Sequence, residues 1–451
     1  MVSARHLAWT TLMKVYQGAY ADVALQNSLK DSQLLPPDRA LMTELVYGCV
    51  RRQRTLDTIV QQLSTKPQKL AAELRVVLQI GLYQLRYLSH IPAAAAVHTT
   101  VELCKSVKVA YGVGFVNAVL RQYLRRQEAQ SEVLSLPPDP LDRLGILHSY
   151  PRWILETWET QLQDGAAGCD LEQLCEWFNR PPRIDLRVNP LRASLETVQA
   201  AFKAVGTEVE PIAGLPQALT LPLGAGAIPL LPGFAEGHWM VQDRSAQLVS
   251  HWLDPQPGET IADACAAPGG KTLHLAELLQ NQGTILAYDR TVSRLKKLRG
   301  NLKRLGVTCI EVCQGDSQAQ PDLEGRCDRV LVDAPCSGLG TLHRHADARW
   351  TQTAETVKEL ADLQGKLLRS AATWVKPGGV LVYATCTLHP AENEHQIAAF
   401  LEDHPQWSID RPPIASQSPA VPWFLAKPHW LKLWPHQANM DGFFIVRLRH
   451  G

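Results

Sequence analysis

The sequence contains no apolar run of the roughly 18–20 residues that a membrane-spanning helix requires. Its first residues, Met-Val-Ser-Ala-Arg-His, lack the apolar segment of a signal peptide. The ten cysteines include no C-x-x-C pair, and the closest two, Cys309 and Cys313, are spaced C-x3-C. This spacing does not support a structural zinc site. We therefore expect a cytoplasmic protein in a reducing compartment, with mostly free thiols and no metal.

The sequence also has almost no net charge, because it contains 45 Lys and Arg and 44 Asp and Glu residues. The charges are unevenly spread, however. Residues 1–126 hold 16 Lys and Arg against 7 Asp and Glu, whereas the remaining 325 residues hold 29 against 37. A basic front joined to a mildly acidic remainder indicates that the front binds a polyanion. Solvated helix faces would give the same count, so charge alone leaves both interpretations open.

The chain has 451 residues, which is more than a single hydrophobic core usually accommodates. The length therefore predicts two or three domains. We expect an all-α domain at residues 1–135, a linker with a small α+β module at 136–237, and an α/β domain at 238–451. In the last range, strand and helix patterns alternate as in a parallel sheet.

The first range has apolar residues at three- and four-residue steps, as from Leu70 to Leu88, which is typical of amphipathic helices. Basic clusters stand near predicted helix ends, at residues 51–54 and 121–126. The first cluster either stabilises a helix C-terminus or contacts RNA phosphates.

The middle range opens with a proline-rich linker, Leu136-Pro-Pro-Asp-Pro140. Alternation over Ile184–Val188 predicts a strand with arginines on one side, and spacing over Leu195–Val205 predicts a helix. We expect this module to extend the substrate surface. Nearby aromatic residues either stack on unpaired bases or, as we favour, lie in the core; they are Trp153, Trp158, Trp177 and Phe178.

The segment Ile261–Thr272 has the pattern of a strand, a glycine-containing loop and a helix, which in open α/β sheets binds nucleotide-like ligands. A P-loop fits Gly270-Lys-Thr272, but its first glycine position is Cys265. The dinucleotide fingerprint G-x-G-x-x-G is absent. The remaining option is S-adenosylmethionine, which has no pyrophosphate.

Carboxylates stand where the next predicted strands end. Thr284–Asp289 ends in Asp289, which can accept hydrogen bonds from ribose hydroxyls. A further strand ends at Asp316, which can accept from an adenine amino group. Arg329–Asp333 ends in Asp333, directly before Ala-Pro-Cys-Ser-Gly338. Several carboxylates beside a glycine loop favour a cofactor site over ordinary strand caps.

Two cysteines, Cys336 and Cys386, follow the ends of adjacent predicted strands, and we expect them to share one crevice with Asp333 and Lys271. Thiolate addition at C6 of cytosine makes C5 nucleophilic enough to take a methyl group. This chemistry needs an activated cysteine, a hydrogen-bonding group at the base edge and a second group for release. By this argument either cysteine could attack.

Three segments carry a resemblance to a known family: Asp263-Ala-Cys-Ala-Ala-Pro-Gly-Gly-Lys-Thr272, Asp333-Ala-Pro-Cys-Ser-Gly-Leu-Gly-Thr341 and Tyr383-Ala-Thr-Cys-Thr-Leu-His-Pro-Ala-Glu-Asn393. They resemble the Sun/Fmu RNA 5-methylcytosine methyltransferases, which implies a Rossmann-like class I methyltransferase domain. Segments such as Asp38–Tyr47 and Gly114–Arg121 resemble the NusB-type RNA-binding domain. The whole chain is thus similar to the bacterial 16S rRNA cytosine-C5 methyltransferases of the Rsm series.

The resemblance implies roles for individual residues. Cys386 would be the nucleophile, and Cys336 would help to free the product from the adduct. Asp333 and Lys271 would lie near both cofactor and base. The residues implied to bind or border S-adenosylmethionine are Cys265, Ala266, Ala267, Pro268, Gly269, Gly270, Lys271, Asp289, Asp316 and Asp333.

The expected substrate is 16S rRNA in an unassembled or early small-subunit state, since a paired target base must first be extruded. Two alternatives stay open: methylation of tRNA, and a non-catalytic RNA-binding assembly factor. We expect a monomer. His343 and His345 have no assigned role; we expect their loop to pack beside the active site, with Arg344 or Arg349 contacting RNA.

Overall fold

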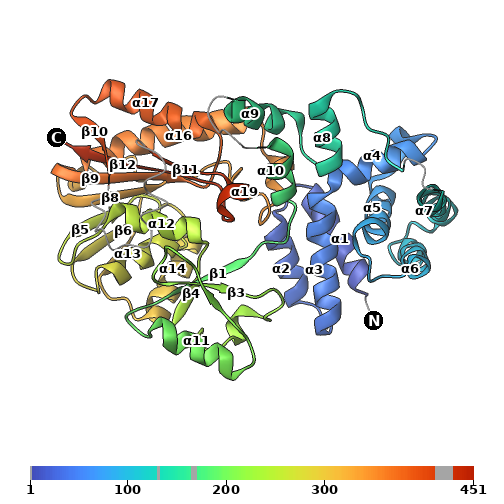
Figure 1. Cartoon of the computed structure of the whole chain (residues 1–451), viewed down its shortest axis with the longest axis horizontal. Coiled ribbons are helices and arrows are strands. Elements are labelled where there is room, and N and C mark those ends of the chain that lie inside the picture. The colour runs from blue at the N-terminus through green and yellow to red at the C-terminus, as the bar shows by residue number, and fades with distance from the viewer. Residues whose placement is uncertain (1–2, 130–132, 164–169, 412–429) are drawn as a thin grey trace. The chain divides into compact units, whose positions relative to one another are not determined.

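The computed structural model describes residues 3–129, 133–163, 170–411 and 430–451. The chain forms two compact units (Figure 1). Unit 1 comprises residues 1–180 and 342–352, and unit 2 comprises residues 181–341 and 353–451. Among the described helices, none is long and apolar enough to cross a membrane.

Unit 1 is helical, as predicted for the front of the chain. Its main helices are α1 (Ala4–Tyr16), α2 (Ala21–Lys30), α3 (Pro36–Arg51), α4 (Gln53–Leu63), α5 (Ala72–Tyr87), α6 (Ala93–Ser106), α7 (Val113–Glu128), α8 (Pro140–His148), α9 (Arg152–Gln163) and α10 (Leu171–Trp177). The apolar stripe of α5 is buried from Leu74 to Tyr83. Trp158 and Phe178 stack in the interior with ring centroids 5.4 Å apart. These two aromatic residues are therefore core residues, as favoured from the sequence.

The first arginine cluster serves the fold of unit 1. Arg51 is buried, and its guanidinium donates to the carbonyl of His343 at 3.0 Å. Arg54 donates to the carbonyl of Tyr150 at 2.6 Å and pairs with Asp142 at 3.1 Å. The interpretation of Arg51 as a phosphate contact is therefore wrong, because only 8% of the residue is exposed and its guanidinium binds a backbone carbonyl.

The smaller sheet of unit 2 has the order β2-β3-β1-β4. Its strands are β1 (Ile184–Val188), β2 (Glu210–Pro211), β3 (Ala218–Leu221) and β4 (Trp239–Val241), and α11 (Leu195–Ala204) follows β1. Phe202 of α11 packs against Trp239 of β4 in a common core. The expected strand and helix of the small α+β module are both confirmed.

The larger sheet has the order β10-β12-β9-β8-β5-β6-β7, with β11 paired to β12. Its strands are β5 (Thr260–Asp263), β6 (Thr284–Asp289), β7 (Ile310–Gln314), β8 (Cys327–Asp333), β9 (Val375–Thr385), β10 (Trp407–Asp410), β11 (Leu431–Leu433) and β12 (Phe443–His450). The strands from β5 to β9 are parallel, and β12 is antiparallel to β9. The strand order reverses between β5 and β8, which is where open α/β sheets bind ligands.

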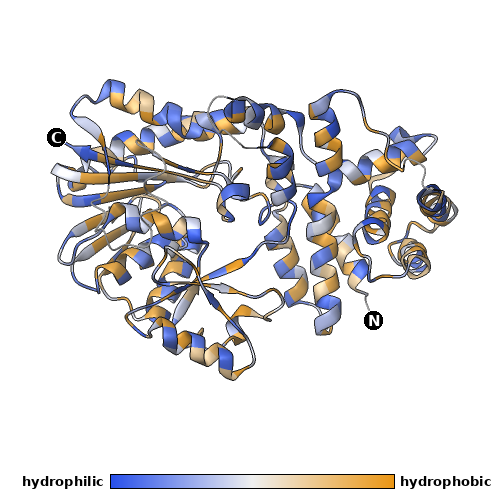
Figure 2. Ribbon diagram, in the orientation of Figure 1, coloured by the Kyte–Doolittle hydropathy of each residue, from blue (hydrophilic) through white to orange (hydrophobic). Residues whose placement is uncertain are grey.

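Helices cover both faces of this sheet (Figure 1). The helices α12 (Arg244–Leu253), α13 (Gly270–Leu278) and α14 (Val292–Leu305) pack on one face, and α16 (Ala354–Thr373) and α17 (Glu394–Asp403) pack on the other. Leu331 of β8 belongs to the first core, whereas Val330 and Val332 belong to the second. The strands are accordingly largely hydrophobic in Figure 2. The α/β class expected for the last part of the chain is confirmed.

Candidate active site

The glycine loop joins β5 to α13. Gly269 adopts φ +110°, a conformation that side chains with Cβ rarely adopt, and a Cβ there would lie 2.4 Å from Leu298 Cδ1. The Ala267–Pro268 peptide is cis. Two arginines hold carbonyl groups of the loop: Arg294 of α14 donates to Ala267, and Arg187 of β1 donates to Gly270 at 2.7 Å. The loop is therefore fixed by elements on either side of it.

Four carboxylates gather at the strand ends next to this loop. Asp263 ends β5 and is buried, and it accepts a hydrogen bond of 2.7 Å from Thr272 Oγ1. Burial raises the pKa of Asp263 to about 7, despite the hydrogen bond from Thr272. Asp289 ends β6, with 5% of its side chain exposed, and lies 3.4 Å from Arg294. Asp316 follows β7, and Asp333 ends β8.

The four carboxylates at the strand ends restrict the kind of ligand that can bind there. Carboxylates at neighbouring strand ends repel a phosphate but accept hydrogen bonds from hydroxyl, amino and ammonium groups. The edge therefore suits a nucleoside that carries positive charge better than a nucleotide. S-adenosylmethionine, with its sulfonium, ammonium and ribose groups, is such a ligand.

The two cysteines singled out from the sequence lie in contact. Cys336 Sγ, in the loop after β8, is 3.3 Å from Cys386 Sγ, directly after β9. Both side chains are partly exposed. The hydrogen bond with Cys386, and then burial, raise the pKa of Cys336 well above its usual value. The raised pKa disfavours the thiolate form of Cys336.

Lys271 and Asp333 form an ion pair at the same strand ends. Lys271 Nζ, at the start of α13, is 2.7 Å from Asp333 Oδ2 and 4.9 Å from the ring centroid of Phe443. Burial lowers the pKa of Lys271, but the charge and hydrogen bond of Asp333 outweigh it, so the pKa is raised overall. Lys271 is thus a fixed ammonium group.

Some residues around the site received no role from the sequence. Asp263 is the first residue of the segment Asp263–Thr272, but no role was predicted for it. Its position at the end of a strand is the same signal that identified Asp289 as a candidate. Glu392 is buried and contacts the residues that follow both cysteines. Arg294 had only its place on a basic helix as a signal. None of these contacts is visible from local sequence spacing.

The loop at residues 342–352 belongs to unit 1. Arg349 is fully buried, and its guanidinium donates to backbone carbonyls of Arg51, Ser149 and Phe178 at 3.1–3.3 Å. Of the two arginines expected to contact RNA, Arg349 is therefore excluded, because its side chain is fully buried. The RNA contact of Arg344 stays a prediction. His343 is buried too, with its ring 4.6 Å from that of Trp177.

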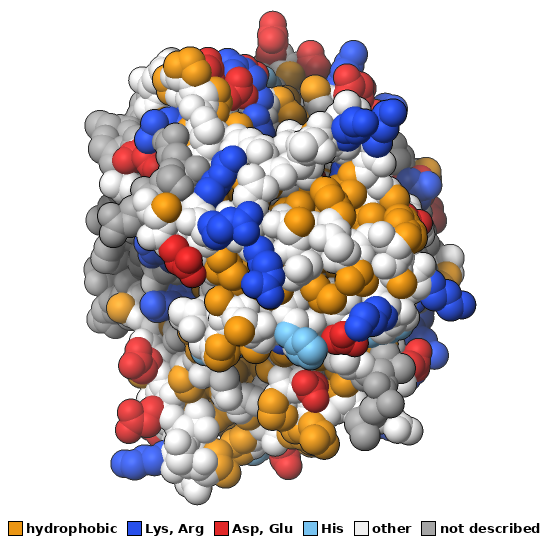
Figure 3. Space-filling model, turned by 90° about the vertical axis from the view of Figure 1, so that its right-hand side faces the viewer, with side chains coloured by type: hydrophobic (Ala, Val, Ile, Leu, Met, Phe, Trp, Pro, Cys, Tyr) orange, Lys and Arg blue, Asp and Glu red, His pale blue; other side chains and the backbone are white. Residues whose placement is uncertain are grey.

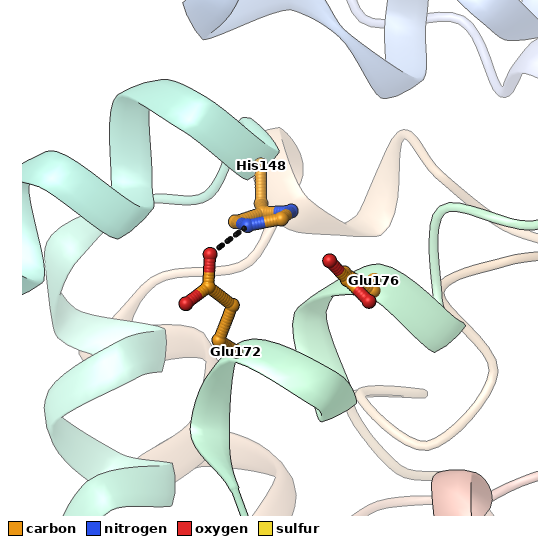
Figure 4. A group of neighbouring side chains, drawn as sticks. All are labelled: His148, Glu172 and Glu176. Atoms are coloured by element: carbon orange, nitrogen blue, oxygen red, sulfur yellow. Dashed lines mark hydrogen bonds and ion pairs between the residues drawn. The ribbon is translucent and has the colours of Figure 1, made fainter.

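Within the described residues, one group of side chains could hold a metal ion, in unit 1 (Figure 4). His148, Glu172 and Glu176 each offer one ligand atom, and these atoms lie within 4.8 Å of one another. His148 Nε2 is 3.2 Å from Glu172 Oε1, and both glutamates are exposed. A hydrogen bond between His148 and Glu172 accounts for the contact between these two side chains.

Comparisons with known proteins agree with this architecture. Residues 250–449 match the family described as 16S rRNA methyltransferase RsmB/F. Residues 2–125 match the NusB family, and residues 150–225 match the ferredoxin-like domain of RsmF/B-like methyltransferases.

Similar proteins cover nearly the whole chain. It is 46% identical to the probable ribosomal RNA small subunit methyltransferase B of Synechocystis sp., over 100% of both sequences. It is 35% identical to the protein of the same name from Bacillus subtilis, over 99% of this chain and 98% of the relative. The crystal structure of the protein PH0851 superposes with a TM-score of 0.79 at 27% identity, over 99% of both chains.

Proposed function

Because the chain belongs to the RsmB/F family of 16S rRNA methyltransferases, we propose that it methylates C5 of a specific cytosine in 16S rRNA. The observation that carries this proposal is the 3.3 Å contact between the Cys336 and Cys386 thiols, at the strand edge that also holds the Lys271–Asp333 pair. Methyl transfer to an oxygen or an amino nitrogen requires no cysteine nucleophile, whereas transfer to C5 does.

Cys386 is the nucleophile in this proposal. Its thiolate adds to C6 of the cytosine, so that a C6–S bond forms and the electron pair of the C5–C6 double bond becomes available at C5. C5 is then nucleophilic enough to bond an electrophilic methyl group. The Cys336 thiol, 3.3 Å away, can donate a hydrogen bond to the Cys386 thiolate and stabilise it. Lys271, held by Asp333, would donate a hydrogen bond to the edge of the base where the developing negative charge collects.

Cys336 then acts in product release. Once the Cys386 sulfur is bonded to C6, it carries no charge, so a thiolate on Cys336 no longer faces a second thiolate. Cys336, which is partly exposed, can then release its own proton to solvent and, as a thiolate, take up the proton from C5 of the methylated base. The C5–C6 double bond re-forms, and the C6–S bond breaks to return the Cys386 thiolate. Adduct formation would thus itself prepare the base that resolves the adduct.

S-adenosylmethionine would supply an electrophilic methyl group when bound. The loop from Cys265 to Lys271 would surround it, and Asp333 would border it. Asp289 would accept hydrogen bonds from the ribose hydroxyls, and Asp316 from the adenine amino group. All of these residues lie at or directly after the strand ends of the larger sheet.

The remaining parts of the chain would bind RNA. We assign residues 1–135 to RNA docking, 136–237 to a linker and a module that extends the RNA surface, and 238–451 to catalysis. The face of unit 1 drawn in Figure 3 carries several neighbouring Lys and Arg side chains, which suits a phosphate backbone.

The test is methyl transfer by the purified protein to three substrates: protein-free 16S rRNA, the finished small subunit and bulk tRNA. We expect 5-methylcytosine in the nucleoside digest of protein-free 16S rRNA, and bisulfite sequencing should map it to one position. 5-Methylcytosine only in tRNA would favour the tRNA alternative. No methylation of any RNA, with binding intact, would favour an assembly factor.

A further inference from the structure

We propose that Glu392 is a positioning residue that sets the spacing of the two active-site thiols. The catalytic importance of this role rests on the proposed function. The distance between the two thiols, however, can be tested in the protein without RNA. Glu392 acts through its hydrogen bonds to Ser337 and Thr387, the residues that directly follow the two cysteines.

Glu392 connects the loops that carry the two cysteines. Ser337, directly after Cys336, donates its backbone N–H to Glu392 Oε1 at 2.8 Å and its hydroxyl to Oε2. Thr387, directly after Cys386, donates its hydroxyl to Oε2 at 3.1 Å. The hydroxyls of Ser337 and Thr387 are also 2.8 Å apart. One carboxylate thus joins the two chain segments one residue away from each sulfur.

The residues before each cysteine are held by the neighbours of Glu392. Gln364 of α16 donates to the carbonyl of Pro335 at 2.9 Å and to Glu392 Oε1 at 3.0 Å. Asn393 accepts from the Thr385 hydroxyl at 2.6 Å and donates to the Thr387 carbonyl at 3.0 Å. Each cysteine is therefore fixed on both sides, and Glu392 is the group common to both loops.

The chemistry of Glu392 favours an orienting role over general stabilisation. It is fully buried, and burial raises its pKa, partly offset by hydrogen bonds from Ser337, Gln364 and Thr387. Those donors are all uncharged. A buried carboxyl group costs desolvation energy that an apolar side chain would avoid, but its oxygens accept several directed hydrogen bonds at once. Directed bonds fix positions, which is what two thiols in contact require.

The experiment measures thiol spacing in the RNA-free protein. Diamide, a two-electron thiol oxidant, converts two adjacent thiols to a disulfide while its azo group is reduced to a hydrazine. Mass spectrometry of peptides gives the rate at which Cys336 and Cys386 become linked. The variants are Glu392→Ala, which removes the acceptors, and Glu392→Gln, which keeps the shape. Glu394→Ala is the matched control, because Glu394 pairs with Lys432 instead.

We expect Glu392→Ala to form the disulfide about tenfold more slowly, since a small misplacement of reacting groups has effects of this size or larger. Glu392→Gln and Glu394→Ala should stay near the wild-type rate. An unchanged rate in Glu392→Ala would overturn the proposal. If circular dichroism shows that Glu392→Ala does not fold, Thr387→Val takes its place. This variant removes one donor at nearly constant shape; slower linking supports the proposal, and an unchanged rate contradicts it.

Methylation assays then separate this inference from the proposed function. Glu392→Ala should lower kcat with little change in KM for RNA, and Glu392→Gln should restore most of the activity. If the wild-type protein methylated no RNA while Glu392→Ala still slowed disulfide formation, the proposed function would fail and the positioning role would stand.

Discussion

The guanidinium of Arg187 lies 2.7 Å from the carboxylate of Glu277, and both side chains are completely buried. Arg187 is on β1 of the smaller sheet, and Glu277 is on α13, the helix that begins at the glycine loop. Arg187 also donates to the carbonyl of Gly270. This ion pair connects the small α+β module to the helix that follows the glycine loop within unit 2.

Removing one partner of this pair should destabilise unit 2 strongly. Arg187→Met leaves the Glu277 carboxylate buried without its cation, and breaking such pairs costs about 3–5 kcal/mol. Urea unfolding should show this loss. The double variant Arg187→Met/Glu277→Leu should recover part of it, because no charge is left buried. A double variant that is destabilised by the sum of the two single changes would contradict this explanation.

The buried carboxyl group of Asp263 should make stability depend on pH. Its pKa in the folded protein is about 7, against about 3.9 for a free side chain. Between about pH 3.9 and pH 7, the folded state therefore binds a proton that the unfolded state does not. The stabilisation that this proton gives is lost as the pH rises through about 7. We expect Asp263→Asn, which mimics the protonated form, to gain melting temperature relative to wild type between about pH 5 and pH 8. A constant difference in melting temperature would show that Asp263 does not titrate in this range.

Gly269→Ala should weaken cofactor binding. The new Cβ would meet Leu298 at 2.4 Å, in a backbone conformation with φ +110°. Strain of about 1–3 kcal/mol in the loop corresponds to about a fivefold or larger rise in the Kd for S-adenosylmethionine, which isothermal titration calorimetry can measure.

The control for this change is Gly300→Ala on α14, where a Cβ would meet nothing within 4 Å. This substitution should leave the Kd unchanged. Equal effects of Gly269→Ala and Gly300→Ala would argue against a role for the loop in binding.

Arg349→Ala should lower the melting temperature of the protein by several degrees, because it leaves buried carbonyl groups of unit 1 without donors. It should do so in the absence of RNA. Arg180→Ala, at an exposed position, should have little effect. A variant with wild-type stability but weaker RNA binding would restore the view that Arg349 contacts RNA.

The sheet and the thiol pair could be predicted from the sequence because they depend on local patterns. The strand Thr284–Asp289 has the predicted bounds. Cys336 and Cys386 follow neighbouring parallel strands, so their proximity follows from strand order. Arg349 and Glu392 could not be predicted in this way. Their partners are decided by which loops and helices meet in three dimensions, as when Arg349 reaches Arg51.

The most direct test of the proposed mechanism is the covalent protein–RNA adduct formed by each cysteine variant with protein-free 16S rRNA and S-adenosylmethionine. Denaturing electrophoresis separates the adduct from free protein. We predict that Cys336→Ala accumulates the adduct and that Cys386→Ala forms none. An adduct in Cys386→Ala together with none in Cys336→Ala would reverse the two roles and contradict the mechanism.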